Sequence, residues 1–183
     1  MNYQTQLDAI IADLYASQTR PSLLLHVCCA PCASYVLEYL ASGFDISIFF
    51  FNPNIQPREE YDRRLAELRR LLKLTKRDVP LIEGEYAYRA WGDCSECVGL
   101  RIRRTAEIAS ERGFDRFCTT LSISPHKDAK LINELGAAAS AELGVEWLPS
   151  DFKKRNGYLS STQICRELNI YRQSYCGCLA ARP

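Results

Sequence analysis

The sequence predicts an α/β fold in which a mainly parallel sheet is covered by helices on both faces. Short apolar runs typical of buried strands alternate with longer segments that carry apolar residues at helical spacing. The composition, 47% apolar and 25% charged over 183 residues, is that of a globular chain able to form a core without disulfides. We therefore expect a single domain over residues 1–183, with a ligand site at the carboxyl ends of the strands.

The first part of the sequence is expected to form two helices and two strands in alternation. Apolar residues at helical spacing predict a helix at 7–15, and the uninterrupted apolar run at 23–27 predicts a buried strand. The segment 33–40 is again helical in pattern, and the apolar segment 44–51 predicts a second strand. Asparagines and prolines at 52–57 then predict a loop.

A long amphipathic helix is expected at 58–74, followed by a strand at 79–82. One face of this helix is apolar and should cover the sheet: Tyr61, Leu65, Leu68 and Leu72. Its charged side chains are expected to pair with one another in solvent: Glu59, Arg63, Glu67 and Arg70.

The alternation continues to residue 148. A helix is expected at 96–112, where a glycine ends it, and a strand at 114–121. The loop 122–126 leads into a helix that runs through residue 143, and 145–148 predicts a last strand. We find no internal repeat, low-complexity stretch or second domain in the sequence.

The N-terminal sequence indicates the cellular compartment, and the net charge bears on nucleic-acid binding. The first 20 residues are polar and do not resemble a signal peptide, and no apolar run approaches the roughly 20 residues of a membrane helix. We expect a soluble protein in a reducing cytoplasm, where the count of nine cysteines indicates function rather than a disulfide framework. The formal net charge of +1 gives no overall attraction to nucleic acid.

Seven cysteines fall in three short clusters. They are Cys28, Cys29 and Cys32 in HVCCAPC, Cys94 and Cys97 in CSEC, and Cys176 and Cys178 in YCGC. Several thiolates gathered from distant segments are soft ligands that suit iron–sulfur clusters, zinc or iron. The sequence therefore predicts a metal or redox site where these segments meet.

The first cluster lies in the turn after the strand 23–27 and at the start of the next helix. A nucleotide-binding protein carries a glycine-rich phosphate loop there, whereas this chain has thiols and Pro31. The partial positive charge of a helix N-terminus favours thiolates. Two isolated cysteines, Cys118 and Cys165, are assigned to packing, and His26 is expected to be a hydrogen-bonded core histidine.

The motifs resemble those of the epoxyqueuosine reductases of the QueH type. They are LLLHVCCAPC, CSEC ahead of RIRRTAEIA, GFDRFCTTLSISPHKD, DFKKRNGY and YRQSYCGC, in this order over nearly the whole chain. The resemblance implies a Rossmann-like three-layer αβα fold of the adenine-nucleotide-hydrolase type that holds metal in place of a nucleotide. It also implies the last step of queuosine biosynthesis, in which the epoxide on the tRNA wobble base becomes an alkene without cobalamin.

That reaction needs two electrons and two protons, which a [4Fe-4S] cluster and nearby acids can supply. We assign the cluster to Cys28, Cys29, Cys94 and Cys97. The remaining thiols are Cys32, Cys176 and Cys178. They either help to hold a second mononuclear metal, iron or zinc as isolated, or provide a strained, redox-active Cys176–Cys178 disulfide.

Proton donors and substrate contacts are expected in the motifs nearest the cysteines. The candidate proton donors are Asp151 and Tyr158, and Asp151 can also complete a metal centre. The candidate substrate contacts are His126, Lys153, Lys154, Arg155 and Tyr175. Without the resemblance, Asp151 is interpreted as a turn residue and 153–155 as a solvated charge run. The partners implied are a tRNA carrying epoxyqueuosine and a one-electron donor protein or low-potential reductant.

Two other classes of protein use the same residue types. A thiol–disulfide oxidoreductase needs only one redox pair and no iron. A structural zinc protein binds a closed-shell metal and shows no turnover. A cluster-dependent tRNA thiolase is disfavoured because HVCCAPC stands where its SGG-type phosphate loop would be.

Overall fold

The computed structural model describes residues 2–88 and 93–178. Its sheet has five strands, all parallel, in the order β3-β2-β1-β4-β5. The strands are β1 (Ser22–His26), β2 (Asp45–Phe50), β3 (Leu81–Glu83), β4 (Arg116–Thr119) and β5 (Glu146–Trp147). The predicted α/β fold class with a parallel, Rossmann-like sheet is confirmed.

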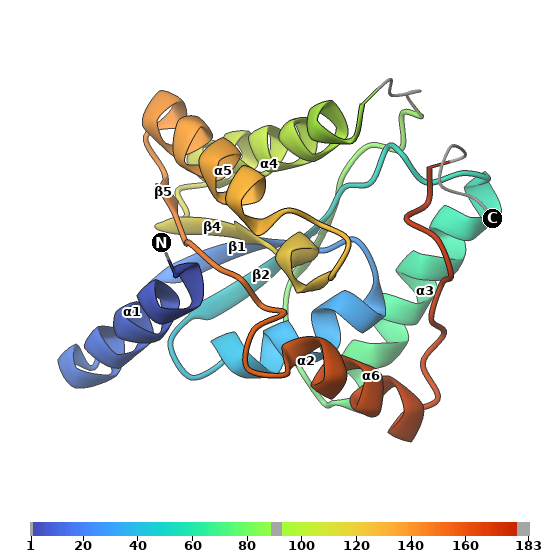
Figure 1. Cartoon of the computed structure of the whole chain (residues 1–183), viewed down its shortest axis with the longest axis horizontal. Coiled ribbons are helices and arrows are strands. Elements are labelled where there is room, and N and C mark those ends of the chain that lie inside the picture. Colours follow the sequence, from blue (N-terminus) through green and yellow to red (C-terminus); the bar gives the residue numbers. More distant parts are fainter. Residues whose placement is uncertain (1, 89–92, 179–183) are drawn as a thin grey trace.

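Helices cover both faces of the sheet, as Figure 1 shows. The helices are α1 (Tyr3–Ser17), α2 (Ala30–Leu40), α3 (Arg58–Leu74), α4 (Cys94–Glu111), α5 (Ala129–Leu143) and α6 (Gly157–Glu167), with a short 3-10 helix, η1 (Thr120–Ile123). Residues of α1, α2, α3 and α6 share one hydrophobic core cluster, and residues of α4 and α5 share the other. The molecule therefore has three layers.

The central strand shows how the sequence produces the two cores. Successive side chains of a strand point to opposite faces, so Leu23 and Leu25 pack in the α2–α3 core whereas Leu24 packs in the α4–α5 core. All three are fully buried. This explains why the strand is an unbroken apolar run rather than an alternating one.

Some boundaries differ from those predicted. The strand expected at 114–121 ends at Thr119, because the chain turns there into η1 and the Thr119 hydroxyl accepts a hydrogen bond from Leu121 N at 3.2 Å. The helix expected at 33–40 begins at Ala30, with Pro31 in its first turn, where a missing N–H costs nothing.

A sixth helix, α6, carries Cys165, and its start follows an unusual turn. Arg155 and Asn156 both have positive φ angles, 52° and 64°, so the chain reverses before the helix begins at Gly157. That turn defines the backbone of the DFKKRNGY segment.

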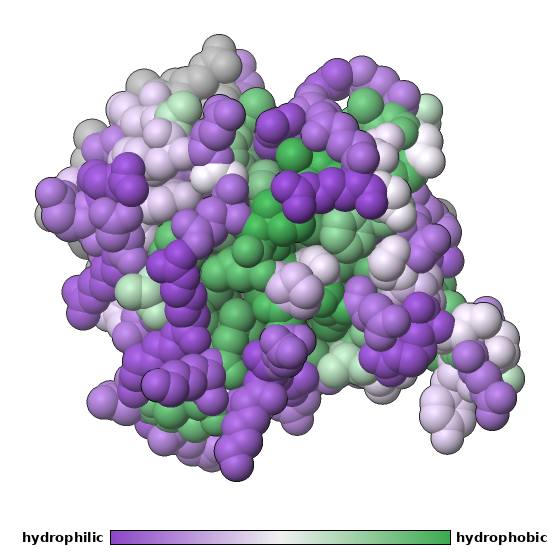
Figure 2. All heavy atoms as spheres, turned by 180° about the vertical axis from the view of Figure 1, so that it is seen from behind, coloured by the Kyte–Doolittle hydropathy of each residue, from purple (hydrophilic) through white to green (hydrophobic). Residues whose placement is uncertain are grey.

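The reverse side of the molecule has a hydrophobic central area bordered by hydrophilic side chains (Figure 2). Within the described ranges, every helix is too short or too polar to cross a bilayer.

Candidate metal centre

The sheet order places a topological switch point at the carboxyl ends of β1 and β4. From β1 the chain continues to β2 on one side, whereas β4 pairs with β1 on the other. Such a switch point is where open α/β sheets bind their ligands. The segment containing Cys28, Cys29 and Cys32 leaves β1 at this point, and Thr120 follows β4 beside it. Cys28 Sγ lies 3.9 Å from Thr120 Oγ1.

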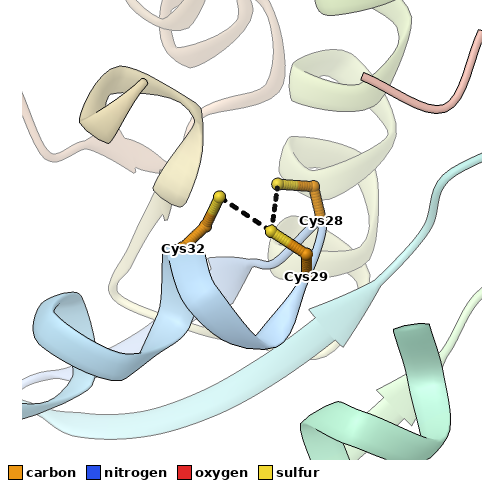
Figure 3. Close-up of side chains that lie close together, drawn as sticks. All are labelled: Cys28, Cys29 and Cys32. Atoms are coloured by element: carbon orange, nitrogen blue, oxygen red, sulfur yellow. Dashed lines mark hydrogen bonds between the residues drawn. The ribbon is translucent and has the colours of Figure 1, made fainter. Parts of the chain in front are cut away.

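Three thiols converge at the switch point, as Figure 3 shows. Cys29 Sγ lies 2.8 Å from Cys32 Sγ and 3.6 Å from Cys28 Sγ. All three sulfurs lie within 4.8 Å of one another, a spacing that allows one metal centre to be bound. Cys29 is the N-cap of α2 and Cys32 lies in its first turn, so the positive end of the helix dipole faces the sulfurs. We call these residues the thiol cluster.

The three thiols of the cluster shift one another's pKa values. Hydrogen bonds from Cys29 and Cys32 lower the pKa of Cys28 well below its ordinary value, whereas burial raises the pKa of Cys29. The hydrogen bond to Cys28 is the largest cause that raises the pKa of Cys32. One thiolate, at Cys28, is therefore favoured even without a metal.

His26 is the hydrogen-bonded core histidine that the sequence predicts. Its Nδ1 lies 2.8 Å from Thr119 Oγ1 and its Nε2 lies 3.0 Å from Phe51 O. Burial, and then the charge of Arg101, lower the pKa of His26 to about 4. The ring is therefore neutral at pH 7.

Arg101 on α4 is a buried cation that sequence reasoning missed. Its side chain is only 1% exposed, Nε donates to Cys97 O at 3.1 Å, and within the described ranges Nη2 has no hydrogen-bond partner. None of the ion pairs formed by described residues includes Arg101. Its charge contributes to lowering the pKa of Cys28. Because a buried guanidinium needs negative charge nearby, this side chain favours anionic sulfur or an anionic ligand at the thiols.

Buried amides add to these unsatisfied groups. Asn52 donates from Nδ2 to Val27 O at 3.0 Å. Among the residues that the structure describes, neither Asn52 Oδ1 nor any side-chain polar atom of Asn54 has a partner. Both side chains are buried in the loop after β2, at the same edge of the sheet. Buried polar atoms are normally hydrogen-bonded, so they too indicate that this edge receives a ligand.

The other predicted cysteines lie outside the group of three sulfurs. Cys94 and Cys97 are in the first turn of α4, Cys94 exposed and Cys97 buried. Burial raises the pKa of Cys97, Arg101 opposes this and the charge of Cys176 adds to it. Cys97 is therefore within electrostatic reach of Cys176 in the YCGC segment.

Cys176 and Cys178 are free thiols in an irregular segment that Arg64 of α3 contacts. The remaining cysteines, Cys118 and Cys165, are buried in the core away from these groups, as predicted.

The predicted proton donors and basic residues have partners of their own. Lys153 Nζ donates to Asp151 Oδ1 at 2.6 Å, and Arg155 pairs with Asp8 of α1 at 2.5 Å, so the expected solvated charge run is partly a set of ion pairs. Lys154 is exposed, as expected for a solvated residue. Tyr158 is 38% exposed and accepts from Arg172 Nη2 at 3.4 Å.

His126 and Tyr175 differ in exposure. His126 lies exposed in the loop before α5. Tyr175 is partly buried, and its hydroxyl donates to Gln56 O at 2.6 Å. Tyr175 thus also fixes the segment beside Cys176.

The fold and the thiol cluster together define a class of protein. This is a Rossmann-like α/β protein whose ligand edge carries sulfur donors and a buried cation instead of a phosphate-binding loop.

Comparison with known proteins identifies the family. A sequence model described as "Epoxyqueuosine reductase QueH" matches residues 23–182. Proteins named Epoxyqueuosine reductase QueH from Streptococcus pyogenes serotype M1 and Staphylococcus epidermidis are each 39% identical over 99% of this chain, covering 78% and 84% of their own lengths. The protein of that name from Thermotoga maritima is 33% identical over 86% of this chain and 88% of its own length.

The chain therefore belongs to the QueH family of epoxyqueuosine reductases, and it is an enzyme of the oxidoreductase class. This confirms the family resemblance of its motifs. Among solved structures, a crystal structure of a deacetylase–teicoplanin complex aligns with a TM-score of 0.44 and 13% identity, over 78% of this chain and 86% of that one.

Proposed function

We propose that this chain reduces epoxyqueuosine at the wobble position of a tRNA to queuosine. Family membership supports the reaction, and the observation that carries it is the thiol cluster at the switch point, where a nucleotide-binding relative would hold phosphate. The net reaction converts the epoxide, two electrons and two protons into an alkene and water. The chain must therefore hold a source of electrons, bind the modified base and deliver protons.

The thiol cluster and the buried Arg101 fit an anionic cofactor ligated by sulfur. The three sulfurs of the thiol cluster lie close enough to share one centre, and the unpartnered Nη2 of Arg101 offers a positive charge to it. We propose that a [4Fe-4S] cluster is held by Cys28, Cys29, Cys94 and Cys97. When bound, such a cluster supplies electrons one at a time, and a metal with an open position stabilises the oxygen of the opening epoxide.

The three remaining thiols are proposed for a second role. Because Cys32 Sγ lies 2.8 Å from Cys29 Sγ, a metal bound through Cys32 would adjoin the cluster. Cys176 and Cys178 would then complete that iron or zinc site, with Asp151 as a further ligand. In the alternative, Cys176 and Cys178 form a redox-active disulfide that relays electrons.

Protons are proposed to come from the DFKKRNGY segment. In the Lys153–Asp151 pair the ammonium donates to the carboxylate, so this pair holds an exchangeable proton, and Tyr158 is the second candidate donor. His126, Lys154, Arg155 and Tyr175 are proposed to contact the tRNA, whose loop bases and phosphates suit aromatic and basic side chains. A tRNA substrate places the reaction in the cytoplasm, with a one-electron donor protein as a second partner.

The test is an anaerobic assay of purified protein with epoxyqueuosine-containing tRNA and a low-potential reductant. Iron and sulfide are quantified, and the nucleosides are identified by mass spectrometry. We expect queuosine from the wild-type chain, loss of both product and iron in Cys94→Ala, and retention of both in the control Cys118→Ala.

Three outcomes would reject parts of the proposal. Iron-replete protein that leaves the epoxide intact removes the substrate assignment. Zinc without iron or turnover indicates a structural zinc protein. Metal-free protein that only exchanges disulfides indicates a thiol–disulfide oxidoreductase.

A further inference from the structure

The segment that carries Cys176 and Cys178 has no regular secondary structure. We call residues 168–178 the C-terminal strap; they contain no described helix or strand. In Figure 1 this stretch follows α6 and runs alongside α3. The positions of its two thiols are therefore set by contacts with other elements rather than by a helix or sheet of its own.

A polar stripe on α3 supplies those contacts. Residues spaced by three or four positions lie on one face of a helix, and each of these four bonds to the strap: Glu60, Arg64, Glu67 and Arg70. At the far end of the strap, Arg70 donates to Leu168 O at 3.2 Å and Asn169 O at 2.9 Å. Glu67 Oε2 accepts from Tyr171 N at 3.0 Å. The expected pairing of Glu67 with Arg70 in solvent exists at 3.2 Å, but both side chains also bind the strap.

Arg64 contacts the cysteine end of the strap. Its Nη1 donates to Cys176 O at 2.9 Å and its Nη2 to Tyr175 O at 3.1 Å. Nε donates to Glu60 at 2.7 Å, and Glu60 also accepts from the Tyr171 hydroxyl at 3.0 Å. The guanidinium is 2% exposed, so all three nitrogens are committed to fixed partners out of water.

The charges of the thiol cluster also act on this guanidinium. Although burial lowers it, the bond to Glu60 and the charges of Cys29 and Cys28 raise the pKa of Arg64 above its ordinary value. The strap fits closely here: a Cβ on Gly177, whose φ is +114°, would lie 2.7 Å from Ile55 Cγ1 and 3.2 Å from Arg64 Nη1. Gly177 O in turn accepts from Gln56 N at 2.8 Å.

We infer that Arg64 is a positioning residue that fixes Cys176 and Cys178 relative to the thiol cluster. The inference rests on the proposed function, because it assigns a use to that placement: the two sulfur groups must act together during turnover. It holds for either proposed role of Cys176 and Cys178, since a shared metal and an electron relay both require a fixed separation.

The test compares Arg64→Lys with the matched control Arg70→Lys. Both arginines lie on α3, and each donates from its planar guanidinium to two carbonyl groups of the strap. Both changes keep the positive charge but remove the guanidinium. Two backbone amides report on the two ends of the strap, Gln56 N–H at the cysteine end and Tyr171 N–H at the other. In the full, anaerobically purified chain we expect Arg64→Lys to speed hydrogen exchange at Gln56 roughly tenfold or more, and Arg70→Lys to speed it only at Tyr171.

Turnover provides the second measurement. Arg64→Lys should lower kcat about tenfold or more with KM for tRNA and iron content unchanged, whereas Arg70→Lys keeps wild-type kinetics. Gly177→Ala, which disturbs the same contact from the strap side, should reproduce the effects of Arg64→Lys. The inference would be overturned if the Gln56 amide exchanged hydrogen at the same rate in both lysine variants. It would also be overturned if Arg64→Lys kept the wild-type kcat. If the wild-type chain itself fails to reduce the epoxide, the proposed function fails, while the exchange data still decide whether Arg64 holds the strap.

Discussion

Replacement of Arg101 by methionine should have opposite effects on the metal-free and the metal-loaded protein. The side chain is buried, Nη2 is unpartnered within the described ranges, and no described carboxylate pairs with it. Replacing buried charges by apolar side chains of similar volume is often neutral or stabilising. For the metal-free chain we therefore expect a free energy of unfolding that is unchanged or higher by about 1–2 kcal/mol.

In the loaded protein the same change removes a cation from near the proposed anionic centre. Two unit charges about 4–6 Å apart at an effective dielectric constant of about 20 attract by about 3–4 kcal/mol. A loss of about 3 kcal/mol corresponds to about two decades in equilibrium constant, or a fall of about 120 mV in a one-electron potential. We therefore expect Arg101→Met to retain less iron and to show a more negative midpoint potential.

The assay pairs urea unfolding of the metal-free chain with a redox titration of the loaded chain followed by electron paramagnetic resonance. Arg101→Lys, which keeps the charge, is the control and should shift the potential much less than Arg101→Met. The reasoning would be refuted by a metal-free Arg101→Met protein that is less stable by more than about 2 kcal/mol and a loaded one with the wild-type potential. Arg101 would then be a structural residue.

Three further changes test the surrounding structure. Asn133→Ala should lower the free energy of unfolding, measured in urea, by about 3–5 kcal/mol. The Asn133 amide is hydrogen-bonded to the buried Trp147 indole and to buried backbone groups, and all of these would lose a partner. In Gly157→Ala the new Cβ would lie 1.9 Å from Phe152 O, so the preceding loop must shift; we expect about 1–3 kcal/mol lower stability and a larger loss of activity than of iron. Hydrogen bonds from the hydroxyl and amide of Ser22 lower the pKa of Asp115, so its carboxylate stabilises the fold above that pKa and the contribution is lost as the pH falls through it. Asp115→Asn should therefore be less stable than wild type at pH 7, and thermal unfolding should show the difference vanishing in acid.

The sequence predicted the central elements better than the edge strands. The helix at 58–74 has the predicted bounds, because its apolar stripe is regular and Pro57 precedes it. The central strand was predicted from its unbroken apolar run. The edge strands β3 and β5 are shorter than or displaced from the predicted 79–82 and 145–148, since pairing on one side only leaves their ends less constrained.

The location of the thiol cluster could also be predicted, because the turn after a first buried strand is a ligand position in α/β sheets. The burial of Arg64 and Arg101 could not be predicted. Arg64 follows Tyr61 by three residues and Arg101 follows Cys97 by four, so each lies on the buried face of its helix. A charged residue on an apolar stripe was the available signal. Its meaning depends on what packs opposite, which only the three-dimensional structure shows.

The route of the C-terminal strap had no sequence signal at all, because an irregular segment has no periodicity to detect. The assignment of each cysteine to a cluster, a second metal or a disulfide stays a prediction. The single-domain organisation over residues 1–183 likewise stays a prediction.

The two buried arginines, whose charges act on the thiol cluster, belong to opposite layers of the molecule. Arg64 belongs to α3, in the core shared with α2, and Arg101 belongs to α4, in the core on the other face of the sheet. Both positive charges therefore act on the thiol cluster only after both layers have docked on the sheet. Insertion of an anionic cofactor should accordingly follow folding rather than guide it, and its binding energy then holds the two layers together by mass action. Maturation of this enzyme would be a late event on an already assembled chain.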